Sequence, residues 1–210
     1  MKATIASVAS AMYDNMERKE RTDGKPYYVL KEAESWQSDI IHNAHLDRMP
    51  SDDIYERIND ILSTLADLDN DATEDSATER FYEIEPDVYT SDLTAWLNSD
   101  NRNVYYLVEA QESGVTDGFQ LLAIAQQKYI MEIAYAVLNG IVKYVEEIKE
   151  DDAVRICDEC GEIMTEGFCI SGGEEYYCSE PCRDKNYTEE EWEVLYDNGN
   201  GDSYFTTWDE

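Results

Sequence analysis

All five cysteines of this 210-residue chain lie between residues 157 and 182. Four of them form two pairs, Cys157-x-x-Cys160 followed by Gly161, and Cys178-x-x-x-Cys182, with seventeen residues between the pairs. A Cys-x-x-Cys-Gly turn points two sulfur atoms toward one ion, and this spacing is typical of a four-cysteine zinc site. The pattern therefore predicts a small C-terminal fold organised around a metal ion.

Two other chemistries use paired cysteines, a structural disulfide and a redox Cys-x-x-Cys motif. The clustering of pairs in a chain without a clear secretion signal favours metal over both. Four thiolates leave no open coordination position on Zn²⁺, so we expect structural rather than catalytic zinc. Its ligands would be Cys157, Cys160, Cys178 and Cys182. Cys169 is expected to be a small buried residue and not a fifth ligand.

The residues between the two cysteine pairs suit a short hairpin, because glycines and bulky apolar residues share this stretch. The module resembles the short zinc ribbon and treble-clef knuckles, in which a CxxCG turn is followed by a Y-C-S-x-x-C turn that opens a helix. Here the second turn is Tyr177-Cys178-Ser179 with Cys182. The resemblance covers about 30 residues and implies a local fold, not a function.

Many modules of this kind bind nucleic acid through basic side chains. In this chain Arg155, Arg183 and Lys185 are outnumbered by eight acidic residues, Asp158, Glu159, Glu162, Glu166, Glu174, Glu175, Glu180 and Asp184. A nucleic-acid-binding surface needs the opposite sign of charge, so no direct binding of nucleic acid is expected.

Apolar residues at helical spacing run through most of residues 1–150. The first such set is Ile5, Val8, Met12 and Met16. This helix should end near the glycine and proline breaker at residues 23–26. Residues 27–49 are predicted to be helical, although 27–30 could equally form a short strand.

The cleanest helix pattern follows Pro50, with Ser51 as the predicted N-cap. Its apolar stripe is Ile54, Ile58, Ile61, Leu65 and Leu68. Residues 69–80 are polar and rich in turn formers, which predicts an acidic loop. Shorter helices are expected after Ser91 and over residues 103–113.

The longest apolar face covers residues 117–149, with Thr116 as predicted cap and Gly140 as a site where the helix could break or kink. Beyond the cysteines, Thr188 to Glu191 is a capping box that starts a short helix, and residues 204–208 could add an edge strand. We therefore expect a predominantly α-helical domain, residues 1–150, and a small α+β four-cysteine zinc module with an acidic helix and tail, residues 151–210.

The chain carries 48 acidic and 16 basic residues, a formal net charge of −32. Residues 1–48 are near neutral, with seven Lys/Arg and eight Asp/Glu. Residues 49–148 hold five Lys/Arg and twenty-one Asp/Glu, and residues 149–210 hold four Lys/Arg and nineteen Asp/Glu. A small domain needs a net charge of only about 2 to 8 for solubility. The excess therefore predicts a strongly positive partner, of which a nucleic-acid-binding groove is the commonest kind.

Part of this charge forms a row on the helix after Ser51. Asp53, Glu56, Asp60 and Asp67 fall within a sector of about 60° and span about 21 Å. That is about one charge per 5 Å, whereas duplex DNA has one per 1.7 Å. Imitation of DNA would need further acidic faces beside this row. The candidates are Asp69, Asp71, Glu74, Asp75, Glu79, Glu146, Glu147, Glu150, Asp151 and Asp152.

In composition and size the chain resembles the acidic DNA-mimic inhibitors that phages and mobile elements make against restriction enzymes, CRISPR nucleases or repair glycosylases. The resemblance implies a non-catalytic inhibitor whose carboxylates occupy the cationic groove of a nucleic-acid-binding protein in the host cell. One alternative is an interaction adaptor of similar origin, in which the zinc module docks a specific protein. Adaptation to high salt is a weaker alternative, since residues 1–48 would then be acidic too. Their near-neutral surface leaves homodimer formation open.

Two further sets of residues could be metal sites or ordinary surface residues. Asp67-x-Asp69-x-Asp71 begins like a calcium loop, but Ala72 stands where the loop needs glycine, which favours a solvated acidic loop. His42 and His45 could serve a hydrolytic metal site, although no third ligand or catalytic motif accompanies them. The sequence therefore predicts no enzyme.

No stretch approaches the roughly 18 to 20 apolar residues of a membrane span. Residues 1–11 are too weakly apolar for the core of a secretion signal. An anionic membrane surface would repel so acidic a chain. We therefore expect a cytoplasmic location and no membrane partner.

Overall fold

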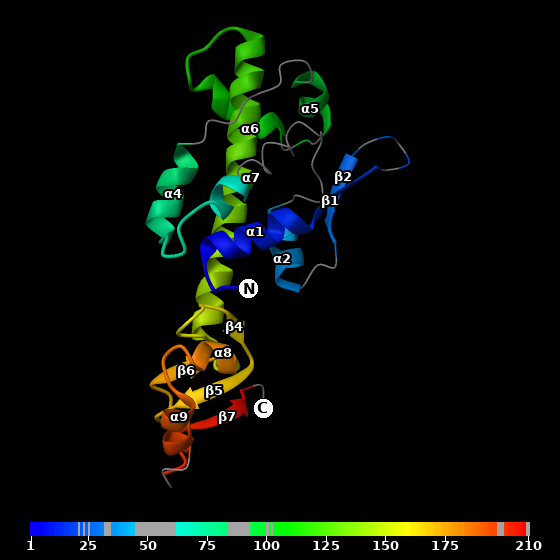
Figure 1. The fold of residues 1–210 in the computed structure, drawn as a ribbon. Coiled ribbons are helices and arrows are strands. Elements are labelled where there is room, and N and C mark those ends of the chain that lie inside the picture. The colour runs from blue at the N-terminus through cyan, green and yellow to red at the C-terminus, as the bar shows by residue number, and fades with distance from the viewer. Residues whose placement is uncertain are drawn as a thin grey trace.

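One long helix runs through the molecule, and the other elements are arranged around it (Figure 1). This helix, α7 (Gly118–Glu150), is contacted by α1, α2, α4, α5 and α6. The cysteine-bearing region follows at its C-terminal end (Figure 1). The computed structural model describes residues 1–20, 22, 24, 26–31, 35–44, 62–83, 93–99, 101, 103–196 and 200–208.

Helix α7 is continuous over 33 residues, and Gly140 neither breaks nor ends it. Its cap is Asp117 instead of the predicted Thr116, because the Asp117 side chain accepts a hydrogen bond from the backbone N–H of Gln120 at 2.9 Å. One face is buried as the periodicity predicts. Phe119, in the first turn, is an apolar residue that stays 66% exposed.

Helix α1 (Ile5–Asn15) ends earlier than its apolar spacing predicts. Met16 already has an extended backbone, and β1 (Met16–Glu20) pairs antiparallel with β2 (Pro26–Leu30). Strand β1 was not expected, whereas the alternative of a strand over 27–30 is confirmed by β2. The physical reason is local: no apolar residue continues the helical stripe after Met16, and aromatic and β-branched residues favour a strand after Pro26.

Helix α2 (Ser35–Asn43) lies against α7. The Trp36 ring stacks on the Tyr144 ring with centroids 4.3 Å apart. Most of the predicted Ser51 helix lies outside the described residues, but residues 62–66 are helical. Leu65 is fully buried, as the apolar stripe predicts, and so is Leu62, which is not part of that stripe.

The predicted acidic loop over residues 69–80 is wrong beyond residue 73, where α4 (Glu74–Tyr82) begins. Thr73 and Ser76 form a reciprocal capping box, and Glu74 and Asp75 lie in the first turn, where negative charge is favourable. Two fully buried residues of α4 pack into the core, Ala77 and Phe81. This i, i+4 apolar pair is the sequence signal for the helix.

Helices α5 (Leu93–Ser99) and α6 (Asn103–Gln111) confirm the two short helices expected there. Tyr129 of α7 contacts both, with ring centroids 5.7 Å from Trp96 and 5.3 Å from Tyr106. Asn103 is fully buried and donates from its side-chain amide to the carbonyl of Trp96 at 2.6 Å. These contacts attach α5 and α6 to α7.

The C-terminal region consists of small sheets and short helices. Strands β3 (Arg155–Ile156) and β4 (Ile163–Met164) pair antiparallel, and a second sheet has the order β6-β5-β7. Its strands are β5 (Glu166–Ile170), β6 (Glu175–Tyr177) and β7 (Tyr204–Thr207). The expected hairpin between the cysteine pairs and the expected edge strand are both present. Helices α8 (Glu180–Arg183) and α9 (Glu189–Tyr196) complete the region.

Within the described ranges, none of the helices combines the length and the apolar character that crossing a membrane requires.

Candidate metal centre

The four predicted ligands meet at one point in the C-terminal region. Cys157 and Cys160 lie in the turn between β3 and β4, Cys178 follows β6, and Cys182 lies in α8. Their sulfur atoms all lie within 4.8 Å of one another. The Sγ of Cys178 is 3.6 Å from the Sγ of Cys160 and 3.6 Å from that of Cys182. The cluster can hold a metal ion.

The sulfur separations fit a tetrahedral site. A Zn–S distance of about 2.3 Å places ligand sulfurs about 3.8 Å apart at the corners of a tetrahedron. A disulfide would bring two sulfurs to about 2.05 Å, and all five cysteines are free thiols. The arrangement therefore matches shared coordination of an ion and not pairwise bonding.

The turn that holds Cys157 and Cys160 is tight and is closed by a backbone hydrogen bond. Gly161 has a positive φ of 73°, and its N–H donates to the carbonyl of Cys157 at 2.8 Å. The backbone N–H of Cys178 points at the Cys157 Sγ at 3.4 Å. A side chain at position 161 would strain this left-handed turn, which explains the glycine that follows Cys160.

The thiols differ in how readily they ionise. Burial alone would raise the pKa of Cys157, but backbone N–H groups of Cys160, Cys178 and Glu159 lower it to about 7. Burial raises the pKa of the Cys178 thiol to about 12. The Cys157 thiol therefore ionises more readily than the Cys178 thiol.

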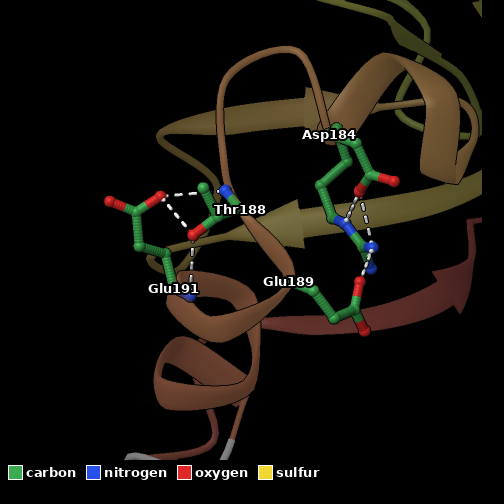
Figure 2. Close-up of polar contacts among 5 residues, drawn as sticks. Asp184, Thr188, Glu189 and Glu191 are labelled. Carbon is green, nitrogen blue, oxygen red and sulfur yellow. Dashed lines mark hydrogen bonds and ion pairs between the residues drawn. The ribbon is translucent and has the colours of Figure 1, made fainter.

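A buried arginine lies next to the cysteine cluster in sequence and packs in the core of the same region. Arg183 follows the ligand Cys182, and its side chain is only 3% exposed. Its guanidinium lies 4.9 Å from the ring centroids of both Phe168 and Trp192. Figure 2 shows the carboxylates that pair with it, Asp184 at 2.6 Å and Glu189 at 2.8 Å. Arg183 thus joins α8, β5 and α9 in one small core.

The predicted capping box is confirmed at the start of α9. The backbone N–H of Thr188 donates to the Glu191 carboxylate at 2.8 Å, and the backbone N–H of Glu191 donates to the Thr188 hydroxyl at 3.3 Å (Figure 2). The backbone N–H and the hydroxyl of Thr188 both donate to the Glu191 carboxylate and lower its pKa. These bonds fix the position at which α9 begins, next to the arginine core.

Sequence reasoning missed the role of Arg183. Its partner Glu189 is six residues away, and its aromatic neighbours lie on another strand and another helix. No spacing rule connects these positions, so only the folded arrangement reveals the contact. Cys169, in contrast, is buried at 2% exposure as predicted and stands apart from the four clustered sulfurs.

The predicted acidic surface is described in part. Asp53, Glu56 and Asp60 lie outside the described residues. The remaining members are all exposed, and they are Asp67, Asp69, Asp71, Glu74, Asp75, Glu79, Glu146, Glu147, Glu150, Asp151 and Asp152. Their exposure leaves them available to a partner.

Some of these carboxylates are brought together from distant parts of the sequence. Asp71 and Glu74, at the start of α4, line one cavity of about 310 Å³ with Glu146 of α7. Lys149 is the basic residue of the same cavity. Others are engaged locally, since Glu147 pairs with Lys143 at 3.2 Å and Asp151 accepts from the backbone N–H of Ala153 at 2.8 Å.

The alternative metal sites gain no geometric support. His42 is exposed at the end of α2, and His45 lies outside the described residues. Across the described ranges, the cysteine cluster is the one set of three or more His, Cys, Asp or Glu residues whose ligand atoms converge. Asp67, Asp69 and Asp71 are described and do not form such a set.

Comparisons with protein-family models, with curated proteins and with solved structures found no match to this chain.

Proposed function

We propose that this chain is a non-catalytic inhibitor of a nucleic-acid-binding protein, and that its carboxylates occupy the partner's cationic groove as a DNA mimic. The observation that carries the proposal is the meeting of Asp71, Glu74 and Glu146 around one cavity. Acidic residues more than 70 positions apart in the sequence thereby form one surface, which a row on a single helix cannot provide.

The arrangement of α4 beside α7 explains how this surface extends (Figure 1). The start of α4 lies near Glu146, and its other end lies near Tyr135, so the two helices run antiparallel. Asp75 and Glu79 lie on the exposed side of α4. Helix α4 therefore adds carboxylates beside Glu146, Glu147 and Glu150 at the C-terminal end of α7, where Lys143 and Lys149 offset part of the negative charge.

We further propose that the ion in the cysteine cluster is Zn²⁺ and that its role is structural. Four sulfur ligands suit zinc and leave no coordination position for a substrate. The cysteine-bearing region has only a small apolar core around Phe168, Tyr177 and Trp192, so a metal would supply much of its stability. The proposed partners are restriction, CRISPR or repair enzymes, which places the chain in the cytoplasm of the host cell.

The proposal is tested with a charge-neutralised variant. Glu74→Gln, Glu79→Gln and Glu146→Gln together remove three charges from the α4–α7 surface. The matched control removes three exposed charges from the cysteine-bearing region, Glu174→Gln, Glu190→Gln and Glu193→Gln. A partner captured from host cells with the wild-type chain should bind the first variant more weakly and the control as before. Equal weakening by both variants would argue for non-specific charge attraction.

The adaptor alternative is favoured by one feature near the cysteine cluster. A shallow depression of about 580 Å³ lies beside α9 and is lined by Tyr187, Thr188, Glu190, Glu191, Val194 and Leu195. Val194 is 70% exposed and Tyr196 is 60% exposed. If this face docks the partner, Val194→Asp should abolish capture while the α4–α7 neutralised variant still binds.

A further inference from the structure

Two tyrosine rings on neighbouring helices lie exposed beside each other. Tyr82, at the end of α4, is 63% exposed, and Tyr135 of α7 is 36% exposed. Their ring centroids are 6.2 Å apart and their planes differ by 31°. The fully buried Phe81 contacts both rings, at 5.3 and 5.8 Å. The pair is therefore an aromatic platform held in place by the core.

Carboxylates flank this platform on the same face of α4. At about 100° per residue, Asp75, Glu79 and Tyr82 point away from the buried Ala77 and Phe81. Residues three apart on a helix have Cβ atoms about 5 to 6 Å apart, so Glu79 is a direct neighbour of Tyr82. An exposed aromatic face and a carboxylate are thus presented together.

Among the residues that the structure describes, no cation covers these rings. Arg80 is the nearest basic residue in sequence, and it is paired with Glu83 at 2.8 Å. In the cysteine-bearing region, by contrast, Arg155 lies over Tyr176 at 5.4 Å. Within the part of the chain that the structure describes, no cation lies over Tyr82 or Tyr135, so their outward faces are open to a partner.

We propose that an arginine side chain of the basic partner stacks on the outward face of Tyr82 and pairs with Glu79. A guanidinium is planar and weakly hydrated, so it can stack on a ring while its N–H groups bond a carboxylate at its edge. It does not enter between Tyr82 and Tyr135, because two stacking contacts need about 7 Å and the rings are closer. The inference rests on the proposed function and specifies arginine as the partner's recognised residue.

The test uses tetra-arginine and tetra-lysine as probes of equal charge, added to the full metal-loaded chain at one fixed salt concentration. NMR signals of the tyrosine rings report binding at each site, and Tyr82→Leu assigns the signal of Tyr82. The affinity read from the Tyr82 ring should be about two- to fivefold higher for tetra-arginine. The ring of Tyr13, which is 42% exposed on α1, should show no such preference.

Two variants separate ring chemistry from charge. Tyr135→Phe leaves the Tyr82 ring in place and should keep its preference for arginine, whereas Glu79→Gln should weaken both peptides at Tyr82. Equal affinities of the two peptides at Tyr82 would overturn the inference about arginine. They would leave the proposed function of the carboxylate surface unaffected. If neither peptide shifted any signal of α4 or α7, the inference and the proposed function would both fall.

Discussion

The backbone N–H of Ile163 donates to the carbonyl oxygen of Met1 at 3.0 Å, which links the residues preceding α1 to the turn that carries Cys157 and Cys160. Lys2 and Glu162 form a β-bridge at the same place, and the amino group of Met1 pairs with the Glu162 carboxylate. The residues that follow the Cys157–Cys160 turn are therefore in direct contact with the residues that precede α1.

Removal of the metal should release this contact first. Without an ion the turn at residues 157–161 has two thiols facing those of Cys178 and Cys182 and little apolar support, so it should open. After chelation, or in Cys160→Ser, amide exchange should accelerate at Ile163, which bonds to residue 1. Exchange at Ile141, fully buried in the middle of α7, should stay slow. Melting of α7 at the same chelator concentration would contradict a local role for the metal.

The packing of Arg183 predicts a difference between two substitutions. Its partners Asp184 and Glu189 have side chains 49% and 67% exposed, so water can hydrate them when the arginine is lost. Arg183→Ala should cost about 2 to 4 kcal/mol, because it empties space between Phe168 and Trp192. Arg183→Met refills that space and should cost less than about 1.5 kcal/mol. Denaturant unfolding followed by near-UV circular dichroism compares them, and equal losses would show that charge pairing dominates.

Helix α9 should depend on pH through Glu191. The capping bonds from Thr188 hold the pKa of Glu191 below its ordinary value, so their stabilisation is complete above about pH 4.3 and is lost as the pH falls through the lowered pKa. Amide exchange at the start of α9 should therefore rise in acid. Glu191→Gln keeps the capping bonds without a titrating group and should remove this dependence. Identical acid profiles in the two proteins would contradict the assignment.

Gly140 allows α2 to approach α7 closely. A Cβ at this position would lie 3.0 Å from Cγ1 and 3.2 Å from Cγ2 of Ile40. Gly140→Ala should therefore destabilise the protein, although alanine improves a helix interior by about 1 kcal/mol. In an Ile40→Ala background the same change should stabilise by about 1 kcal/mol. A double-mutant cycle of unfolding free energies measures this coupling, and additive effects would show that the contact is not tight.

The elements recovered from the sequence are those with a repeated local signal. The apolar stripe of α7, the caps of α9 and the paired cysteines each repeat a rule over a few residues, so they could be predicted. Strand β1 was missed because the apolar spacing up to Met16 resembles a continuing helix. Helix α4 was missed because its polar residues obscure the short buried pair of Ala77 and Phe81.

The candidate sites also differ in whether a local sequence rule predicts them. The four clustered cysteines follow a spacing rule, whereas the meeting of Glu74 with Glu146 depends on how two helices pack. No local rule relates residues so far apart, since the contact is set by the core beneath them. The aromatic platform of Tyr82 and Tyr135 has the same origin, because its rings belong to those two packed helices.

The central claim is that the carboxylate surface replaces DNA on its partner. The most direct measurement is the fluorescence anisotropy of a labelled duplex bound to the captured partner while this chain is titrated in. Mimicry predicts that the duplex is released, that release weakens as salt is raised, and that the Glu74, Glu79 and Glu146 neutralised variant is less effective. Formation of a complex in which the partner holds the duplex and this chain at the same time would contradict the claim.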